Sequence, residues 1–183
     1  MSELQIFDET GQSLSAPTND VGIITSQMNE LDIMFERWET MADLPGDADQ
    51  ETILESYKDS ITKLNDSYGF ELVDVAILSP DNPNKDSIRQ QFNFEHTHSD
   101  FEMRFFVEGS GLFYFHIDDK VYVLLCEKGD LISVPAQVSH WFDMGADPDF
   151  KLIRFFPSVD GWVADKTGSD IATRLPDMDA YAA

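Results

Sequence analysis

The sequence predicts a mainly β protein with flanking helices, in which short antiparallel strands form a sandwich or barrel. Short apolar or alternating runs separated by turn residues fill positions 94–156, whereas helix-type spacing is confined to the first 92 residues. The 183 residues are 42% hydrophobic and include 14 Phe, which suits one domain with one substantial core. We expect a helical and strand-containing part at about 1–92, a β core at about 93–157 and a carboxy-terminal wrap at 158–183.

The amino-terminal part contains signals for both helices and strands. Asp20 is placed to cap a helix, and Asp49 precedes apolar residues at offsets of three and four that continue toward Gly69. A turn cluster at 79–83 separates a β-rich segment from a short helix. The expected elements are a strand at 4–7, a helix after Asp20, a strand at 31–38, a helix from Asp49 that stops at Gly69, a strand in 70–78 and a helix at 85–91.

The second half of the chain is expected to be built from strands. Turn residues, among them Gly109-Ser110-Gly111 and Asp118-Asp119, separate the apolar runs. The two amino-terminal helices would then pack outside these strands. The expected strands cover 105–108, 112–117, 121–126, 131–134, 141–142 and 152–156.

The amino-acid composition limits which macromolecules the protein is expected to bind. Lys and Arg total 12 against 35 Asp and Glu, a formal net charge of −23 that repels nucleic-acid phosphates and anionic lipid surfaces. We therefore expect neither nucleic acid nor membrane as a partner, and the charge favours solubility or tolerance of high salt. The single cysteine, Cys126, excludes an intrachain disulfide and is expected to be a buried thiol. No signal segment or membrane-spanning run is visible, so we expect a cytoplasmic protein. We also expect a monomer.

One stretch carries metal-ligand spacing. His96 and His98 lie two residues apart, so an extended backbone points both imidazoles to the same face. Glu102 and Arg104 repeat this spacing after a short interval, and His140 follows a proline turn downstream. Three imidazoles and one carboxylate make an octahedral site with two open positions and suit Fe(II), Ni(II), Co(II) or Mn(II) better than structural zinc.

These residues resemble the two motifs of the cupin superfamily. The first motif is His96-x-His98, three residues, Glu102, six residues and Gly109; the second is Gly129, five residues and Pro135, with His140 five positions further on. Gln137 stands where cupins often have glycine, and Met144 where many have asparagine. The resemblance implies a single cupin domain, a jelly-roll-like β-barrel.

The wider sequence resembles the acireductone dioxygenase family. The similar segments are Phe35-Glu36-Arg37-Trp38, Asp81-Asn82-Pro83, Glu95-His96-Thr97-His98, Glu102-Met103-Arg104-Phe105, Val107-Glu108-Gly109-Ser110-Gly111, Glu127-Lys128-Gly129-Asp130-Leu131-Ile132, Val134-Pro135-Ala136, His140-Trp141-Phe142-Asp143-Met144 and Gly161-Trp162. The resemblance implies a methionine-salvage enzyme that adds O2 to acireductone and carries one Fe(II) or Ni(II) per chain. The iron form would give 4-methylthio-2-oxobutanoate and formate, and the nickel form 3-methylthiopropanoate, formate and carbon monoxide.

Other side chains are candidates for the substrate site. Arg104, beside Glu102 on the same face, would hydrogen-bond the substrate oxygens and favour their dianion, although a salt bridge to a carboxylate is the simpler alternative. Phe101 stands where the family usually has an acidic residue. The candidates for the pocket are Phe92, Phe142, Arg154 and Trp162, and those for contacts behind the metal ligands are Glu95 and Phe101. The alternative for the aromatic residues is a place in the hydrophobic core, and the alternative for Glu95 is a solvated surface charge.

Two other functions remain open from the sequence. A different cupin dioxygenase or isomerase would also use these ligands on a chelating enediol or sugar, because the fold does not choose the substrate. A cupin that only binds a small molecule is a third possibility, although it has no need for four metal ligands. The fourth histidine, His116, matches no ligand position and is expected on the surface or in the core.

Overall fold

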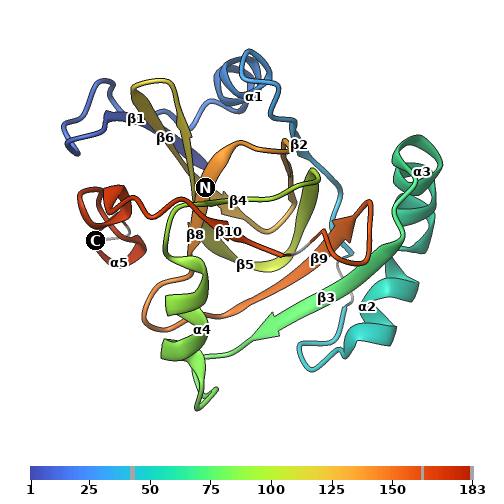
Figure 1. The fold of residues 1–183 in the computed structure, drawn as a ribbon. Helices are drawn as coiled ribbons and strands as arrows, with labels where there is room; N and C mark the ends of the chain where they lie inside the picture. Colours follow the sequence, from blue (N-terminus) through green and yellow to red (C-terminus); the bar gives the residue numbers. More distant parts are fainter. Residues whose placement is uncertain (42–43, 162, 182–183) are drawn as a thin grey trace.

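Two antiparallel β-sheets that share one long strand form the centre of the fold (Figure 1). The computed structural model describes residues 1–41, 44–161 and 163–181. One sheet has the strand order β1-β6-β5-β8-β4-β10, and the other has the order β3-β9-β5-β7-β2. The predicted mainly β fold with flanking helices is confirmed. The strands are β1 (Glu3–Asp8), β2 (Phe35–Arg37), β3 (Leu72–Leu78), β4 (His96–Thr97), β5 (Glu102–Ile117), β6 (Lys120–Glu127), β7 (Asp130–Val134), β8 (Ser139–Asp143), β9 (Phe150–Phe156) and β10 (Asp165–Lys166).

The long strand β5 joins the two sheets. The sequence predicted two strands here with a turn at 109–111, and that turn is wrong, because β5 runs through it for 16 residues. The pairing register shifts between Phe106 and Glu108, and Gly109 takes a positive φ of 76°. Such an irregularity bends a strand without ending it. The first half of β5 therefore pairs with β7 and β9, and the second half with β6 and β8.

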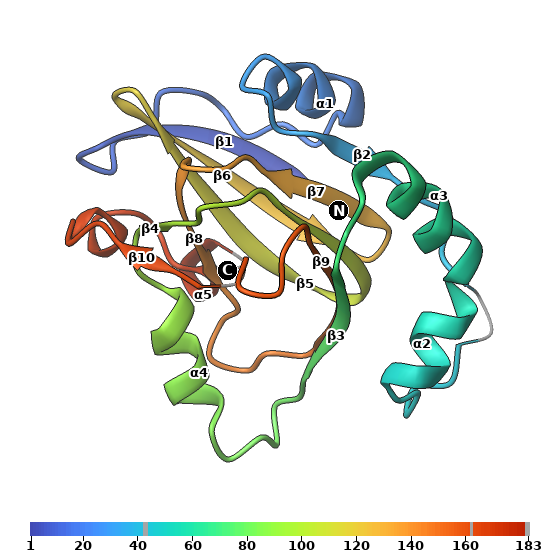
Figure 2. The same cartoon turned by 45° about the vertical axis from the view of Figure 1, so that its right-hand side comes forward.

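Helices lie outside the sheets (Figure 2). Asp20 caps the first of them, because its carboxylate accepts hydrogen bonds from the N–H groups of Gly22 and Ile23, as predicted. None of the helices in the described residues is long and apolar enough to cross a bilayer. The helices are α1 (Val21–Asn29), α2 (Gln50–Ser56), α3 (Lys58–Tyr68), α4 (Lys85–Phe92), α5 (Met178–Tyr181) and a 3-10 turn (Ile171–Thr173).

The strand predicted at 31–38 is shorter than expected. Only β2 pairs, against β7, because the preceding residues still belong to the end of α1. The N–H groups of Leu31 and Ile33 both donate to the carbonyl of Met28, and Asp32 takes a left-handed φ of 60°. The alternation of apolar residues seen in the sequence here reflects a helix end followed by a short strand.

The helix predicted from Asp49 to Gly69 is divided in two. The interruption falls at Tyr57, which has φ −105° and ψ 12°. Its ring is buried, and its hydroxyl accepts a hydrogen bond from the N–H of Met41 at 3.0 Å. Gly69 ends the second helix in the left-handed conformation, with φ 69°, as its position predicted.

Both faces of the sheets are covered, which gives three apolar clusters. Successive residues of β5 alternate between them: Phe106 faces the inner cluster between the sheets, while Phe105 and Val107 face an outer cluster that also contains residues of α2 and α3. In the carboxy-terminal segment, Ile171 and Leu175 are 1% and 7% exposed and complete the third cluster, because their apolar side chains cover the outer face of the first sheet.

Candidate metal centre

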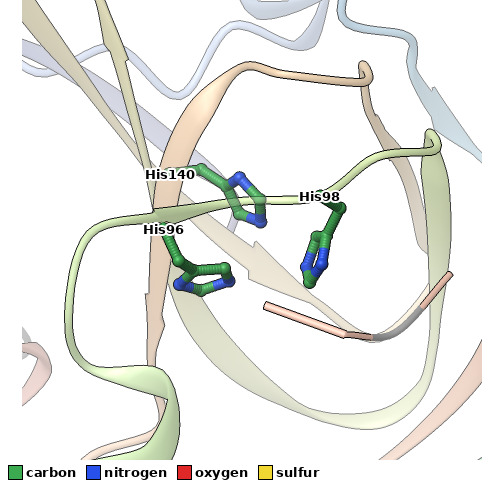
Figure 3. Close-up of side chains that lie close together, drawn as sticks. All are labelled: His96, His98 and His140. Carbon is green, nitrogen blue, oxygen red and sulfur yellow. The ribbon is translucent and has the colours of Figure 1, made fainter. Parts of the chain in front are cut away.

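Three histidines converge at one point beside strands β4 and β8 (Figure 3). His96 lies on β4 and is the cross-strand partner of His140 on β8, while His98 follows directly after β4. One nitrogen from each ring lies within 4.8 Å of the corresponding nitrogens of the other two. All three residues are buried, with exposures of 2% to 5%. The pairing of β4 with β8 thus brings together two motifs that are more than 40 residues apart in the sequence.

Each imidazole is held through its Nδ1 atom. The Nδ1–H groups of His96, His98 and His140 donate to the carbonyls of residues 94, 163 and 138, each at 2.8 Å. This geometry places the proton on Nδ1 and leaves the Nε2 lone pair free on each ring. Among the residues that the structure describes, Nε2 of His140 has no hydrogen-bond partner although it is buried.

The electrostatics keep these rings neutral. Burial lowers the pKa of His96 to about 4, and the neighbouring histidines add to the effect. Burial also lowers the pKa of His140 to about 3. Neutral imidazole is the form that binds a metal, so no proton has to leave these two rings near pH 7.

Glu102 lies at the edge of this cluster, at the start of β5. Its Oε2 is 3.5 Å from Nε2 of His98 and accepts a hydrogen bond from Nη2 of Arg104 at 2.7 Å. Glu102 is 2% exposed, and burial lowers the pKa of the Arg104 guanidinium. The Nη1 atom of Arg104 is buried and has no hydrogen-bond partner within the described residues. One donor of this arginine therefore remains available to a ligand.

The turn before β8 is attached to the same centre. Gln137 donates to the carbonyl of His98 through both its backbone N–H and its Nε2, each at 3.0 Å. It takes a left-handed φ of 64°, which explains why glycine is common at this position in cupins. The side-chain amide supplies a second bond that glycine would lack.

These residues fit a divalent transition metal. Three converging ring nitrogens with fixed tautomers, one of them without a partner among the described residues, and a buried carboxylate beside them form a nitrogen and oxygen donor set that suits such metals.

A cavity of about 270 Å³ opens onto this centre. Its polar lining residues are the three histidines, Glu102, Arg104 and Arg154. Its other lining residues are apolar: Ala76, Ile77, Leu78, Ile88, Phe92, Phe113, Phe142, Met144, Phe150, Leu152 and Ala164. The cavity suits a small molecule that carries both oxygens and an apolar tail.

Three of the four predicted pocket residues line this cavity. They are Phe92, Phe142 and Arg154. Arg154 is committed to Asp74 on the adjacent strand β3, through bonds of 2.7 Å and 2.6 Å. The sequence does not reveal Asp74, because the two residues are 80 positions apart. Trp162, the fourth, lies outside the described residues.

The two residues expected behind the ligands face away from the metal centre. Glu95 is 4% exposed, so the alternative of a solvated charge is wrong. Its carboxylate lies 2.5 Å from Nδ1 of His116 and also contacts the hydroxyl of Thr167. Phe101 packs against Tyr68 and Phe70 in the outer cluster. Phe101 is joined to the site through its covalent neighbour Glu102.

A buried ion pair holds one wall of the cavity. Arg89 on α4 donates to both carboxylate oxygens of Asp143 on β8, at 2.6 Å and 2.8 Å. Asp143 is fully buried and also accepts hydrogen bonds from the N–H groups of Met178 and Gly145. Burial opposes ionisation, but Arg89 and these N–H groups outweigh it and lower the pKa of Asp143. The pair thus fixes α4, which supplies Ile88 to the cavity.

Replacing Asp143 with asparagine is expected to lower the free energy of unfolding by about 2 kcal/mol at pH 7, because Arg89 loses its charge-assisted bonds to a buried carboxylate and keeps only its 2.9 Å pair with the more exposed Asp179. A depressed carboxyl pKa stabilises the folded state above the unfolded pKa of about 3.9. The difference between wild type and variant should therefore be constant above about pH 5 and shrink as the pH falls through the folded pKa. Urea unfolding of metal-free protein from pH 3 to 8 measures it.

Asp147→Asn is the matched control. Asp147 pairs with Lys85 at 2.6 Å but is 79% exposed, so its loss should cost less than about 1 kcal/mol. Equal losses for the two variants would contradict a structural role specific to the Asp143 pair.

The chain resembles characterised proteins over nearly its whole length. Residues 3–164 match the model of the ARD/ARD' family. Proteins named acireductone dioxygenase from Methylococcus capsulatus and from a Hydrogenobaculum species are 51% and 50% identical, over 99% and 100% of this chain and 97% and 99% of their own lengths. The structure of acireductone dioxygenase from Bacillus anthracis with a cadmium ion in its active centre superposes with a TM-score of 0.78 at 27% identity, over 90% of this chain and 98% of that one. Because the family model matches residues 3–164 and the residues of both motifs meet at one centre, the chain belongs to the ARD/ARD' family.

Proposed function

We propose that this protein is a metal-dependent dioxygenase of methionine salvage that cleaves acireductone, 1,2-dihydroxy-5-(methylthio)pent-1-en-3-one, with O2. The observation that supports it most directly is the cavity, which is lined by imidazoles, a carboxylate and two guanidinium groups and otherwise by apolar side chains. The substrate has the same polarity, with three neighbouring oxygens and a methylthio tail. Relatives of full length that bear this name support the same function.

His96, His98, Glu102 and His140 would hold one Fe(II) or Ni(II). A metal held by these residues would supply a positive charge that polarises the substrate oxygens. The chain contributes rigid ligands, because backbone carbonyls hold all three rings through Nδ1. Such outer contacts keep the ligand nitrogens oriented before the metal arrives.

Arg104 would favour the doubly deprotonated enediol. Its guanidinium is buried, and one of its terminal nitrogens, Nη1, has no partner within the described residues. A hydrogen bond from Nη1 to an enediolate oxygen would be charge-assisted and shielded from water, which strengthens it. The dianion is electron-rich and reacts with O2 at carbon. Arg154 would contribute less, because Asp74 already neutralises it.

The apolar walls would enclose the tail and exclude water. Phe92 and Ile88 come from α4, and Phe142 and Met144 come from β8 or directly after it. A sugar would place hydroxyls against these walls without hydrogen-bond partners, which is costly. The walls therefore favour a thioether tail over the sugar substrates of other cupins.

The test is reconstitution of metal-free protein with Fe(II) and, separately, with Ni(II), followed by reaction with acireductone in air. We expect 4-methylthio-2-oxobutanoate and formate from the iron form, and 3-methylthiopropanoate, formate and carbon monoxide from the nickel form. Substrate lost without enzyme is subtracted. If either metal binds at one per chain and acireductone disappears no faster than in the blank, the substrate is wrong; if no transition metal binds, a binding-only role replaces the enzyme.

A further inference from the structure

Gly111 lies directly beneath the ring of Phe142. These residues are on the neighbouring strands β5 and β8, where Phe113 is the cross-strand partner of Phe142 and Gly111 is two positions before it. A Cβ at position 111 would lie 2.3 Å and 2.4 Å from two carbons of the ring, far inside van der Waals contact. Glycine in a strand marks such a close approach, and an aromatic ring often covers it from the next strand.

Other rings limit where Phe142 can go. Its ring centroid is 4.8 Å from that of Phe113 and 6.0 Å from that of Phe150, which meets it edge-on. Both neighbours are buried in the inner cluster. Phe142 also lines the apolar part of the cavity. A side chain at position 111 would therefore push the ring away from β5, and the cavity that the ring lines offers space for this movement.

We propose that Gly111 is a positioning residue that sets the length of apolar tail the cavity accepts. Because Gly111 lacks a Cβ, the Phe142 ring can lie against β5, which leaves the apolar part of the cavity open for the methylthio group. The identity of that tail rests on the proposed function, whereas the displacement of the ring does not. Gly111 would thus determine specificity although it is not one of the residues that line the cavity.

The experiment compares two acireductones in wild type and Gly111→Ala: the methylthio substrate and an analogue whose tail ends before the sulfur. The ratio of kcat/KM for the long substrate to that for the short one should fall about tenfold or more in the variant, because removal of space for one or two heavy atoms has this effect in an apolar pocket. The loss should appear mainly in KM, with metal content unchanged.

Two further variants separate positioning from folding. Gly111→Ala combined with Phe142→Leu should restore the ratio to that of Phe142→Leu alone, because the shorter side chain removes the clash. Gly46→Ala is the matched control: a Cβ there would meet nothing within 4 Å, and the ratio should stay at the wild-type value.

Several results would overturn the proposal. An unchanged ratio, or equal loss for both substrates without rescue, would show that Gly111 does not control tail length. Failure of both the single and the double variant to fold would show that the glycine serves the strand itself. A crystal structure of Gly111→Ala gives an answer independent of turnover: an unmoved Phe142 ring contradicts the proposal, and a ring displaced into the cavity supports it. Wild type that consumes neither substrate would contradict the proposed function instead.

Discussion

His140→Ala is expected to lose metal binding, and with it all turnover above the blank. His140 supplies a buried Nε2 atom that has no hydrogen-bond partner in the described part of the chain, and its position on β8 places it opposite His96. Loss of a residue that merely supports a ligand costs about 10- to 100-fold in metal affinity, so loss of the ligand itself should cost more than about 100-fold. Competition titration with Ni(II) and Co(II), together with metal content after dialysis, measures the loss.

His116→Gln is the control for this variant. His116 is the fourth histidine of the chain, and its ring contacts Glu95 and Glu9 rather than the other three. Glutamine keeps a polar side chain beside the buried Glu95 carboxylate, so the variant should bind one metal per chain with unchanged affinity. Wild-type affinity in folded His140→Ala would remove this residue from the metal site.

Arg104→Ala is expected to keep its metal and to lose about 100- to 1000-fold in kcat/KM, the usual effect of removing one donor to a developing oxyanion. The interaction that is lost favours formation of the dianion. The reduction in kcat/KM should therefore be larger at low pH, where the enediol is protonated, than at high pH. Arg104→Lys keeps the charge but loses the second donor that now holds Glu102. Its rate should lie between those of wild type and the alanine variant.

Arg154→Ala provides the comparison within the same cavity. Because the Asp74 carboxylate already accepts hydrogen bonds from Nε and Nη2 of Arg154, removal of the Arg154 side chain should lower kcat/KM by less than about tenfold. Metal content is measured for every variant so that loss of metal and loss of rate are separated. An Arg104→Ala protein that carries metal and turns over normally would exclude the dianion role.

The sequence predicted the parts of the fold that depend on local chemistry. Caps, turns and alternation placed most strands and the three predicted helices within a few residues, although the structure divides one of these helices in two, because such signals act between near neighbours. The errors occurred where distant contacts override local signals. Gly109 reads as a turn residue, yet pairing of β5 with strands on both sides carries the chain straight through it. Tyr57 reads as one more apolar residue of a long helix, yet its burial and its bond to Met41 interrupt that helix.

The sequence by itself determined which residues form the candidate metal centre, since histidine, glutamate and arginine at these spacings are chemically distinctive. Only the tertiary structure decided how each is held and what surrounds it. Backbone carbonyls that fix the three imidazoles carry no sequence signature, and neither does the absent Cβ of Gly111 beneath Phe142. Ion pairs such as Asp74 with Arg154 and Arg89 with Asp143 join residues 80 and 54 positions apart. Ligand identity is a property of side chains, whereas orientation, burial and cavity shape arise when the strands pair.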